Sequence, residues 1–178
     1  MMKTSFLLTA LAVCSIGTAA TAQQSTPVSD AMRSATARAG RNLVAAAEEM
    51  PAGKYGYKPT PAQMSFGDVI EHLAQGNDYL CGTIGGMEPP KRDEVKPAAG
   101  KAKLVARLKE TFSFCESALA KVDDSNLSGK VPFFDEGEMT RVEAMFLTVD
   151  DWADHYSQLA NYLRLNGHLP PTAKKKSG

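Results

Sequence analysis

The sequence lacks most of the motifs by which enzymes are recognised. It contains no G-x-S-x-G element that would present a nucleophilic serine, no glycine-rich loop that would hold phosphate groups, and neither C-x-x-C nor the haem-attachment pattern C-x-x-C-H. Cysteine is scarce as well, with three residues among 178. A serine or thiol nucleophile and a phosphate-binding loop are therefore not indicated, and any catalysis would have to come from a bound metal ion.

The sequence also lacks an excess of charge of either sign. It has 20 basic and 20 acidic residues, which gives a formal net charge of zero. Because nucleic acids and acidic membrane surfaces bind proteins largely through clustered positive charge, we expect no nucleic-acid partner. Beyond residue 22, no apolar run approaches the length of about 20 residues that a membrane-spanning helix needs. We therefore expect no membrane association of the processed chain.

The first residues have the layout of a cleavable signal peptide. Lys3 supplies a positive start, residues 6–16 form an apolar stretch too short to cross a bilayer, and a small-x-small cleavage pattern ends at Ala22. Cleavage there would release a chain that begins at Gln23. We therefore assign residues 1–22 to a signal peptide and expect a periplasmic or secreted protein.

Two cysteines, Cys81 and Cys115, remain after this cleavage. Each falls on the apolar stripe of its own predicted helix, and export would bring both into an oxidising compartment, where paired thiols become disulfides. A bridge between them would link two neighbouring helices. The sequence does not decide between this disulfide and two buried free thiols, which pack as small apolar side chains.

Four segments of the processed chain show the apolar spacing of amphipathic helices. Apolar residues recur every three or four positions, prolines and glycines separate the segments, and none shows the sustained alternation of a strand. The predicted helices cover residues 29–50, 65–85, 101–122 and 140–166. Four helices with one apolar face each favour an all-α fold, an antiparallel four-helix bundle over residues 23–170. Residues 171–178 are expected to form a disordered Lys-rich tail.

Local signals mark the ends of these helices. Ser65 with Asp68, and Thr140 with Glu143, place a hydroxyl three residues before a carboxylate, which is the spacing of a capping box at a helix start. Gly167 follows the last helix at the position where glycine commonly ends one. The second and fourth predicted helices therefore have well-defined boundaries.

Three residues on these two helices could bind one metal ion. Asp151 and His155 stand four positions apart, so their side chains share a helix face, and His72 flanks the apolar stripe of the second predicted helix. Residues that flank the stripes of two helices can meet in the groove between them. Two imidazoles and one carboxylate would leave open positions on a divalent ion, which could activate water or a thiol. The alternative is a surface carboxylate beside a half-buried histidine.

Other polar residues lie near this group in the sequence. Asp68 precedes His72 by one turn and could orient its second ring nitrogen, although the helix cap explains Asp68 equally well. Gln158 is expected to be a polar neighbour of the group. His168 follows the predicted end of the last helix, so we expect it in a loop without a special role.

Two strings of residues resemble one bacterial family. The first holds Pro59-Thr60-Pro61, Ser65-Phe66-Gly67 and His72-Leu73-Ala74, and the second holds His155-Tyr156, Gln158, Tyr162, Arg164, Asn166-Gly167 and Pro170-Pro171. Together they resemble the DinB-like superfamily of four-helix bundles, which includes damage-inducible DinB proteins and thiol-dependent transferases and isomerases. The resemblance covers nearly the whole processed chain, and the string in the last helix is its most specific part.

This resemblance implies a metal site. In the family, one histidine of the second helix and an H-x-x-x-H pair of the fourth commonly bind a divalent metal such as Zn²⁺ or Ni²⁺, and His72 and His155 match two of these three positions. Asp151 stands where the third histidine would be. A carboxylate is a harder ligand than imidazole, so the expected ion is Zn, Ni, Fe or Mn, unless the substitution marks a degenerate site.

Three functions fit the sequence and the resemblance. The first is a metal-dependent hydrolase or thiol transferase that acts on a small molecule, which the sequence does not identify. The second is a non-catalytic bundle that binds a ligand or partner without metal, and the third is a metal carrier. Low-molecular-weight thiols are chiefly cytosolic, which fits poorly with an exported transferase. The sequence leaves the oligomeric state open, including a homodimer.

Overall fold

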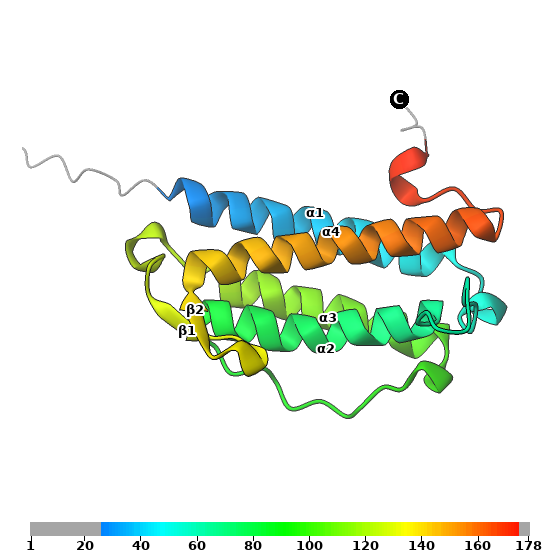
Figure 1. Ribbon diagram of the computed structural model, residues 1–178, viewed down its shortest axis with the longest axis horizontal. Helices are drawn as coiled ribbons and strands as arrows, with labels where there is room; N and C mark the ends of the chain where they lie inside the picture. Colours follow the sequence, from blue (N-terminus) through cyan, green and yellow to red (C-terminus); the bar gives the residue numbers. More distant parts are fainter. Residues whose placement is uncertain (1–25, 175–178) are drawn as a thin grey trace, which may run out of the picture.

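Four long helices form a bundle in the computed structural model, which describes residues 26–174 (Figure 1). The helices are α1 (Pro27–Glu49), α2 (Phe66–Gly85), α3 (Lys101–Leu119) and α4 (Arg141–Leu165). The all-α four-helix fold predicted from the sequence is confirmed, and every helix end lies within three residues of its predicted position. The predicted signal peptide lies outside the described residues.

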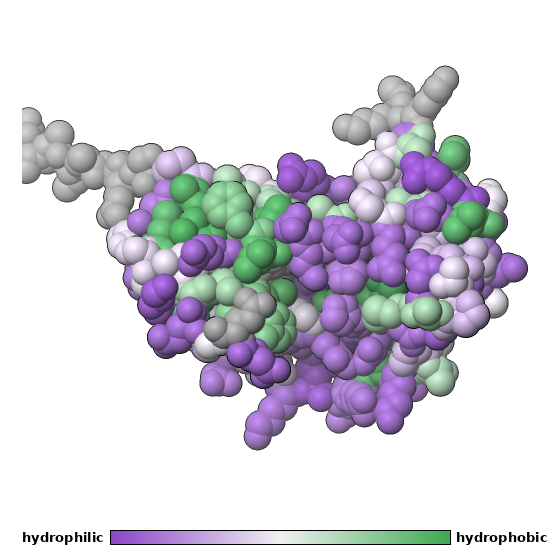
Figure 2. Space-filling view, in the orientation of Figure 1, coloured by the Kyte–Doolittle hydropathy of each residue, from purple (hydrophilic) through white to green (hydrophobic). Residues whose placement is uncertain are grey.

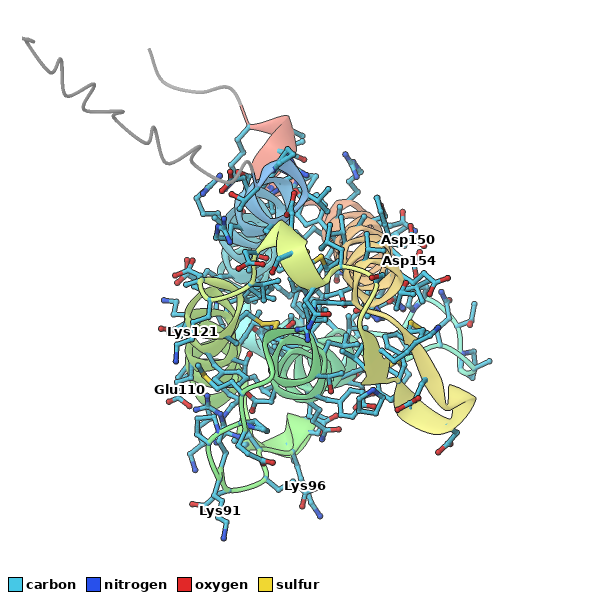
Figure 3. The ribbon with its side chains drawn as sticks, turned by 90° about the vertical axis from the view of Figure 1, so that its left-hand side faces the viewer. Lys91, Lys96, Glu110, Lys121, Asp150 and Asp154 are labelled. Atoms are coloured by element: carbon cyan, nitrogen blue, oxygen red, sulfur yellow. A yellow bond between two sulfur atoms is a disulfide. The ribbon has the colours of Figure 1, made fainter. Side chains whose placement is uncertain are left out.

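The helices run in two directions. α1 and α4 point one way along the bundle, and α2 and α3 point the other way (Figure 1). α1 lies beside α3 and α4, and α2 lies beside the same two helices, as the end-on view also shows (Figure 3). The α1·α3 and α2·α4 neighbours are therefore antiparallel, as expected, whereas the α2·α3 and α1·α4 neighbours are parallel.

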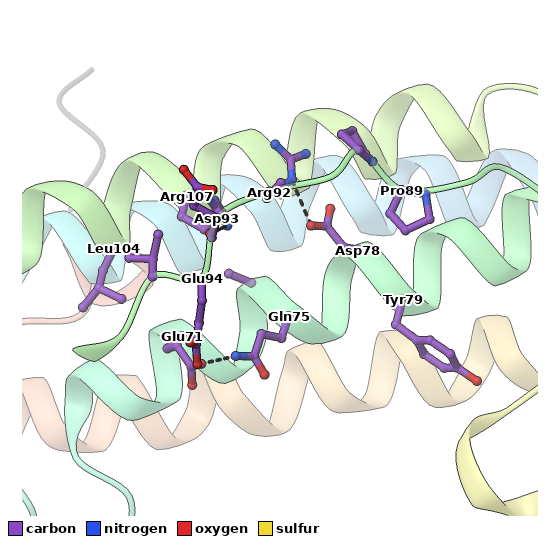
Figure 4. A pocket seen from close by; sticks show the side chains of 13 residues that line it. Glu71, Gln75, Asp78, Tyr79, Pro89, Arg92, Asp93, Glu94, Leu104 and Arg107 are labelled. Atoms are coloured by element: carbon purple, nitrogen blue, oxygen red, sulfur yellow. Dashed lines mark hydrogen bonds and ion pairs between the residues drawn. The ribbon is translucent and has the colours of Figure 1, made fainter. Parts of the chain in front are cut away.

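A long crossover, residues 86–100, makes the parallel arrangement of α2 and α3 possible by returning along the bundle. Its three prolines oppose helix formation, and its regular structure is limited to a 3-10 turn, η2 (Pro97–Ala99). Arg92 fastens the crossover to α2 through an ion pair of 2.9 Å with Asp78, drawn in Figure 4. These two side chains are only 16% and 19% exposed. The crossover is therefore anchored to the bundle by a largely buried contact.

Apolar side chains from all four helices fill the core. A polar connection also crosses it, because the indole Nε1 of Trp152 donates a hydrogen bond to Oδ1 of Asn77 (2.7 Å) and Nδ2 of Asn77 donates to Oγ1 of Thr111 (3.2 Å). All three side chains are buried, and each needs such a partner there. The connection positions α4 against α2 one residue from Asp151. The largest fully buried side chains are Trp152, Tyr162, Phe66, Leu43, Met50, Ile70, Leu73, Ile84, Leu104, Leu108, Leu119 and Leu159.

A disulfide joins Cys81 of α2 to Cys115 of α3, with Cα atoms 5.0 Å apart. Both residues are fully buried. Because the two helices are parallel and begin at the same end of the bundle, residues separated by 34 positions in the sequence reach the same level. The disulfide therefore ties together the two helices that the long crossover connects.

A short hairpin that the sequence patterns did not predict connects α3 to α4. Its strands, β1 (Lys130–Pro132) and β2 (Glu138–Thr140), pair antiparallel with Val131 opposite Met139. Strands of three residues are too short to show a recognisable alternation. β2 ends at Thr140, which is also the N-cap of α4, so the hairpin continues directly into that helix.

Both predicted capping boxes are present. The Asp68 amide donates to Oγ of Ser65 (3.1 Å), and the Asp68 carboxylate accepts a hydrogen bond from the Ser65 amide (2.8 Å). Thr140 and Glu143 form the same reciprocal pair at the start of α4. Gly167 follows α4 with a φ of 79°, a conformation that glycine adopts without strain. Local sequence therefore determines where α2 and α4 begin.

The C-terminal segment differs from the predicted disordered tail. Residues Pro171–Ala173 form a 3-10 turn, η5. The Tyr156 hydroxyl donates to Oγ1 of Thr172 (2.9 Å), and Lys174 forms an ion pair with Glu49 of α1. These contacts hold the chain beyond α4 against the bundle, which the composition of the tail does not reveal. Residues 175–178 lie outside the described part of the chain.

Apolar residues gather on the surface at the end of the bundle where α1 and α4 begin and where the hairpin lies (Figure 2). Large exposed apolar side chains there are Phe134 of the hairpin and Phe146 and Leu147 of α4. Within residues 26–174, no helix combines the length and the apolar character that crossing a bilayer would require. This apolar end borders the candidate site described below.

A carboxylate distant in sequence caps the start of α1. The amides of Val28 and Ser29 donate to the two carboxylate oxygens of Asp124 (3.0 and 2.9 Å), and Oγ of Ser29 donates as well (2.6 Å). The N-cap residue of α1, Thr26, makes no such bond. Burial raises the pKa of Asp124, but the hydrogen bonds from Ser29 and Val28 outweigh it and hold that pKa below its ordinary value.

Asp124→Ala is expected to lower the midpoint of thermal unfolding by about 2–4 °C at pH 7, because α1 loses its cap. A lowered pKa in the folded state means that the ionised cap stabilises the fold above about pH 4 and loses this effect as pH falls through the folded pKa. The difference from the wild-type protein should therefore shrink in acid. Asp123→Ala, which removes only the local hydrogen bonds that Asp123 accepts from the amide and hydroxyl of Ser125, is the matched control. Equal midpoints for the two variants would contradict the assignment.

Candidate metal centre

His72 of α2 and Asp151 and His155 of α4 converge where these two helices pack together. One ligand atom from each residue lies within 4.8 Å of the others. Nε2 of His155 is 3.3 Å from Oδ1 of Asp151, and the two imidazole rings meet edge to face with centroids 5.0 Å apart. The structure therefore gathers into one group the three residues that the sequence predicts as ligands.

The dimensions of this group suit a small divalent ion. Bonds of about 2.0–2.2 Å in tetrahedral geometry place ligand atoms about 3.4 Å apart. The distance between His155 Nε2 and Asp151 Oδ1 already has about this value. Small rotations of the His72 side chain would bring its ring nitrogen equally close to these two atoms. His72 is exposed and the Asp151 side chain is 37% exposed, so the group opens towards the surface. An ion bound by these three residues would keep coordination positions free for another molecule.

A chain of hydrogen bonds determines which nitrogen of His155 is available to a metal. The Tyr162 hydroxyl donates its only proton to the Met64 carbonyl (3.0 Å), so it accepts from Nε2 of Gln158 (3.1 Å). Oε1 of Gln158 then faces Nδ1 of His155 at 3.2 Å, and Nδ1 must carry the proton. In the neutral imidazole, Nε2 is left with a free lone pair directed towards Asp151. Gln158 and Tyr162 thus fix the tautomer in which Nε2 could bind a metal ion.

The charge around His155 is negative. When the ring is protonated, Nε2 donates a hydrogen bond to Asp151, which raises the pKa of His155 above the ordinary value. Burial of the ring lowers this pKa, and the nearby charge of Asp154 adds to the increase. The site therefore attracts a positive charge at Nε2, either a proton or a metal ion. Asp150 and Asp154 extend this acidic character on the outer side of α4 (Figure 3).

The other predicted residues have different positions. Asp68 belongs to the cap of α2, where its hydrogen bonds to Ser65 help to lower its pKa, and it does not join the ligand group. Its alternative role as an orienting partner of His72 is therefore not supported. His168 lies in the loop after α4, with Nδ1 3.6 Å from a carboxylate oxygen of Glu49. Gln158 contacts His155, as described above.

Sequence patterns did not identify Tyr162 as part of the centre. It is 1% exposed, and a buried tyrosine hydroxyl requires a hydrogen-bond partner. Its spacing of four from Gln158 places both residues on one helix face, which is a usable signal. The Met64 carbonyl, however, lies 98 positions away in the sequence. The connection therefore becomes visible only in the folded chain.

Comparison with known proteins identifies the family. A sequence profile of the DinB superfamily matches residues 35–159, which contain all three candidate ligands. A DinB-like protein from Bacillus subtilis has a similar structure, with a TM-score of 0.62 at 16% identity, over 78% of this chain and 93% of that one. A conserved protein from Enterococcus faecalis is also similar in structure, with a TM-score of 0.63 at 18% identity, over 81% of this chain and 98% of that one. These two likenesses concern the fold. No curated protein matches the sequence.

Proposed function

The chain belongs to the DinB superfamily, and on this basis and on the convergence of His72, Asp151 and His155 we propose that it is an exported, metal-dependent hydrolase. The convergence carries the proposal, because two imidazoles and a carboxylate from two helices form a ligand set for Zn²⁺ and its neighbours in the first transition series. Zn²⁺ suits the mixed ligand set best. Asp151 makes Mn²⁺ and Fe²⁺ competitors, and Ni²⁺ remains a candidate because two of the ligands are imidazoles.

The arrangement of the three residues supports the proposal of hydrolysis. A divalent ion with free positions lowers the pKa of bound water and polarises a carbonyl group. His155, held by Gln158, and Asp151 would orient the ion from α4, while the exposed His72 completes the set from α2. A substrate can approach from the open side. Thiol transfer is the weaker candidate, because the low-molecular-weight thiols that it would use are chiefly cytosolic, whereas the Cys81–Cys115 disulfide fits an oxidising compartment.

Two observations support export. The first residues resemble a signal peptide, and disulfides persist mainly in oxidising compartments such as the periplasm and the extracellular space. The Cys81–Cys115 disulfide is fully buried and therefore serves as a structural bond. A protein that acts outside the cytosol would meet small molecules other than the cytosolic thiols.

Metal uptake tests the proposal. Untagged protein purified without chelators is expected to bind about one divalent ion per chain, measured by elemental analysis. Zn²⁺ at 100 times its dissociation constant should stabilise the fold by about 2.7 kcal/mol, seen as a higher unfolding midpoint. His155→Ala should abolish both effects, whereas His168→Ala, which removes a histidine outside the group, should preserve them. Metal-free protein whose stability ignores Zn²⁺, Ni²⁺ and Mn²⁺ would disprove the site.

Activity is tested separately with small p-nitrophenyl esters. The Zn²⁺-loaded protein is expected to hydrolyse them with saturable kinetics, and the His155→Ala variant should show only the background rate. Equal rates for the two proteins, with metal uptake intact, would rule out ester hydrolysis at this centre. In that case the metal-carrier function becomes the better description.

A further inference from the structure

A groove opens beside the metal centre. Its volume is about 560 Å³, and His72 and Asp151 form one end of its lining. Tyr79 of α2, Phe133 and Phe134 of the hairpin and Leu147 of α4 form much of the remainder. Small-molecule sites commonly have volumes of about 300–1,000 Å³. The groove is therefore large enough for a compound that also reaches the metal.

Phe134 is held in this groove by an unfavourable backbone conformation. Its φ of 44° lies in the left-handed region, which costs a bulky residue about 1–2 kcal/mol. The Phe134 amide donates to the Tyr79 hydroxyl (2.6 Å), and the two rings pack with centroids 4.4 Å apart. Even so, Phe134 is 56% exposed. Strain that keeps an aromatic ring in contact with solvent beside a candidate site is a typical sign of ligand binding.

Tyr79 reaches the groove from the same face of α2 as His72. The two residues are seven positions apart, which is two helical turns. In Figure 4, Tyr79 points from α2 towards the hairpin, whereas Asp78 points towards the crossover on the other side. The ligand histidine and the aromatic wall are thus fixed relative to each other by one rigid helix.

The charge of the lining limits what can bind. Among the side chains that the structure describes, the lining includes one carboxylate, Asp151, and no lysine or arginine. A compound with several phosphate or carboxylate groups would find no cation to pair with except the metal. A cationic compound would be repelled by the bound divalent ion. The class of ligand that these limits leave is a mainly apolar molecule with one polar group that can coordinate the metal.

The geometry points to a substrate whose aromatic or short alkyl part lies against Phe134, Tyr79 and Leu147 while its one polar group reaches the ion. This inference rests on the proposed function, because the ion selects the polar end. The groove supplies the specificity, since apolar contact with three side chains favours compounds that carry a ring over those that carry a methyl group. An uncharged ester or amide of an aromatic acid has this form.

Two hydroxamates that differ only in the apolar part test the inference. Benzohydroxamate and acetohydroxamate offer the same metal-binding group to the Zn²⁺-loaded protein, and calorimetry measures both dissociation constants. Burial of the ring is expected to make benzohydroxamate bind about 30-fold more tightly. Phe134→Ala should reduce this ratio to below about 5-fold, because the ligand ring then buries less apolar area. The Zn²⁺ affinity should not change. Phe146→Ala, which removes an equally large exposed ring outside the groove, should leave the ratio unchanged.

The outcomes separate the two proposals. A ratio near one in the Zn²⁺-loaded wild-type protein would overturn the groove and leave the metal site standing. A protein that takes up no metal would overturn the proposed function, and the groove is then tested with the neutral fluorescent probe N-phenyl-1-naphthylamine. Binding of this probe that Phe134→Ala weakens and Phe146→Ala does not would uphold the groove. Equal effects of the two variants, or no binding, would overturn it.

Discussion

Asp151→Ala is expected to weaken Zn²⁺ binding at least about 100-fold, because partners that only orient a ligand already cost 10–100-fold when they are removed. Asp151 is the one anionic member of the group and lies 3.3 Å from Nε2 of His155. Water can replace its oxygen but not its charge. Competition with a chelator of known affinity measures the loss.

Two further variants sharpen this result. Asp150→Ala removes the same charge from the adjacent, exposed position on α4 and should change the affinity less than about 3-fold, because exposed charges interact weakly through solvent. Asp151→His should keep tight Zn²⁺ binding and weaken Mn²⁺ relative to Ni²⁺, since imidazole is the softer ligand. Unchanged Zn²⁺ affinity in Asp151→Ala would remove Asp151 from the ligand set and mark the site as degenerate.

Removing the disulfide is expected to have the largest effect on stability. The double variant Cys81→Ala/Cys115→Ala should lower the free energy of unfolding by about 3–4 kcal/mol, because the bond closes a loop of 34 residues in the unfolded chain. Both positions are fully buried, so alanine fits without placing a polar group in the core. Urea unfolding followed by circular dichroism measures the change.

The controls come from the redox state. In enough reductant to open the bond, the wild-type protein should lose most of its advantage over the variant. The intact mass of exported protein should show a chain that begins at Gln23 and lacks two hydrogens relative to the dithiol. A difference in stability below about 1 kcal/mol would contradict the loop-closure argument. A mass that includes residues 1–22 would contradict the predicted cleavage.

The helices could be predicted because their signals are local. Apolar spacing and the pairs Ser65/Asp68 and Thr140/Glu143 act within one or two turns, and the structure reproduces them. The relative directions of the helices could not be derived in the same way. They depend on residues 86–100, whose length permits either direction until contacts such as Arg92–Asp78 form. The hairpin strands were missed because three residues carry too little pattern.

In the candidate site, too, the features that depend on local spacing could be predicted, and those that depend on distant contacts could not. Asp151 and His155 share a helix face by spacing alone, and the position of His72 on its own helix made the group of three a reasonable prediction. Asp68 stands one helical turn before His72, a spacing that would also suit a partner of that histidine. Its carboxylate instead accepts the hydrogen bond from the Ser65 amide that caps α2. The orientation of Gln158 depends on Tyr162 and on the Met64 carbonyl from a distant loop. No pattern within one helix contains that information.

The direct passage from β2 into α4 has a mechanical consequence for the groove. Phe134, Leu147 and Asp151 belong to one continuous piece of chain that begins in the hairpin and continues into the helix, while His72 and Tyr79 belong to α2. The two walls can separate only if these two pieces slide or tilt against each other, because the described lining residues of the groove all belong to one piece or the other. An ion bound by residues of both pieces would fix the distance between them. Metal occupancy would then determine the width of the groove as well as its chemistry.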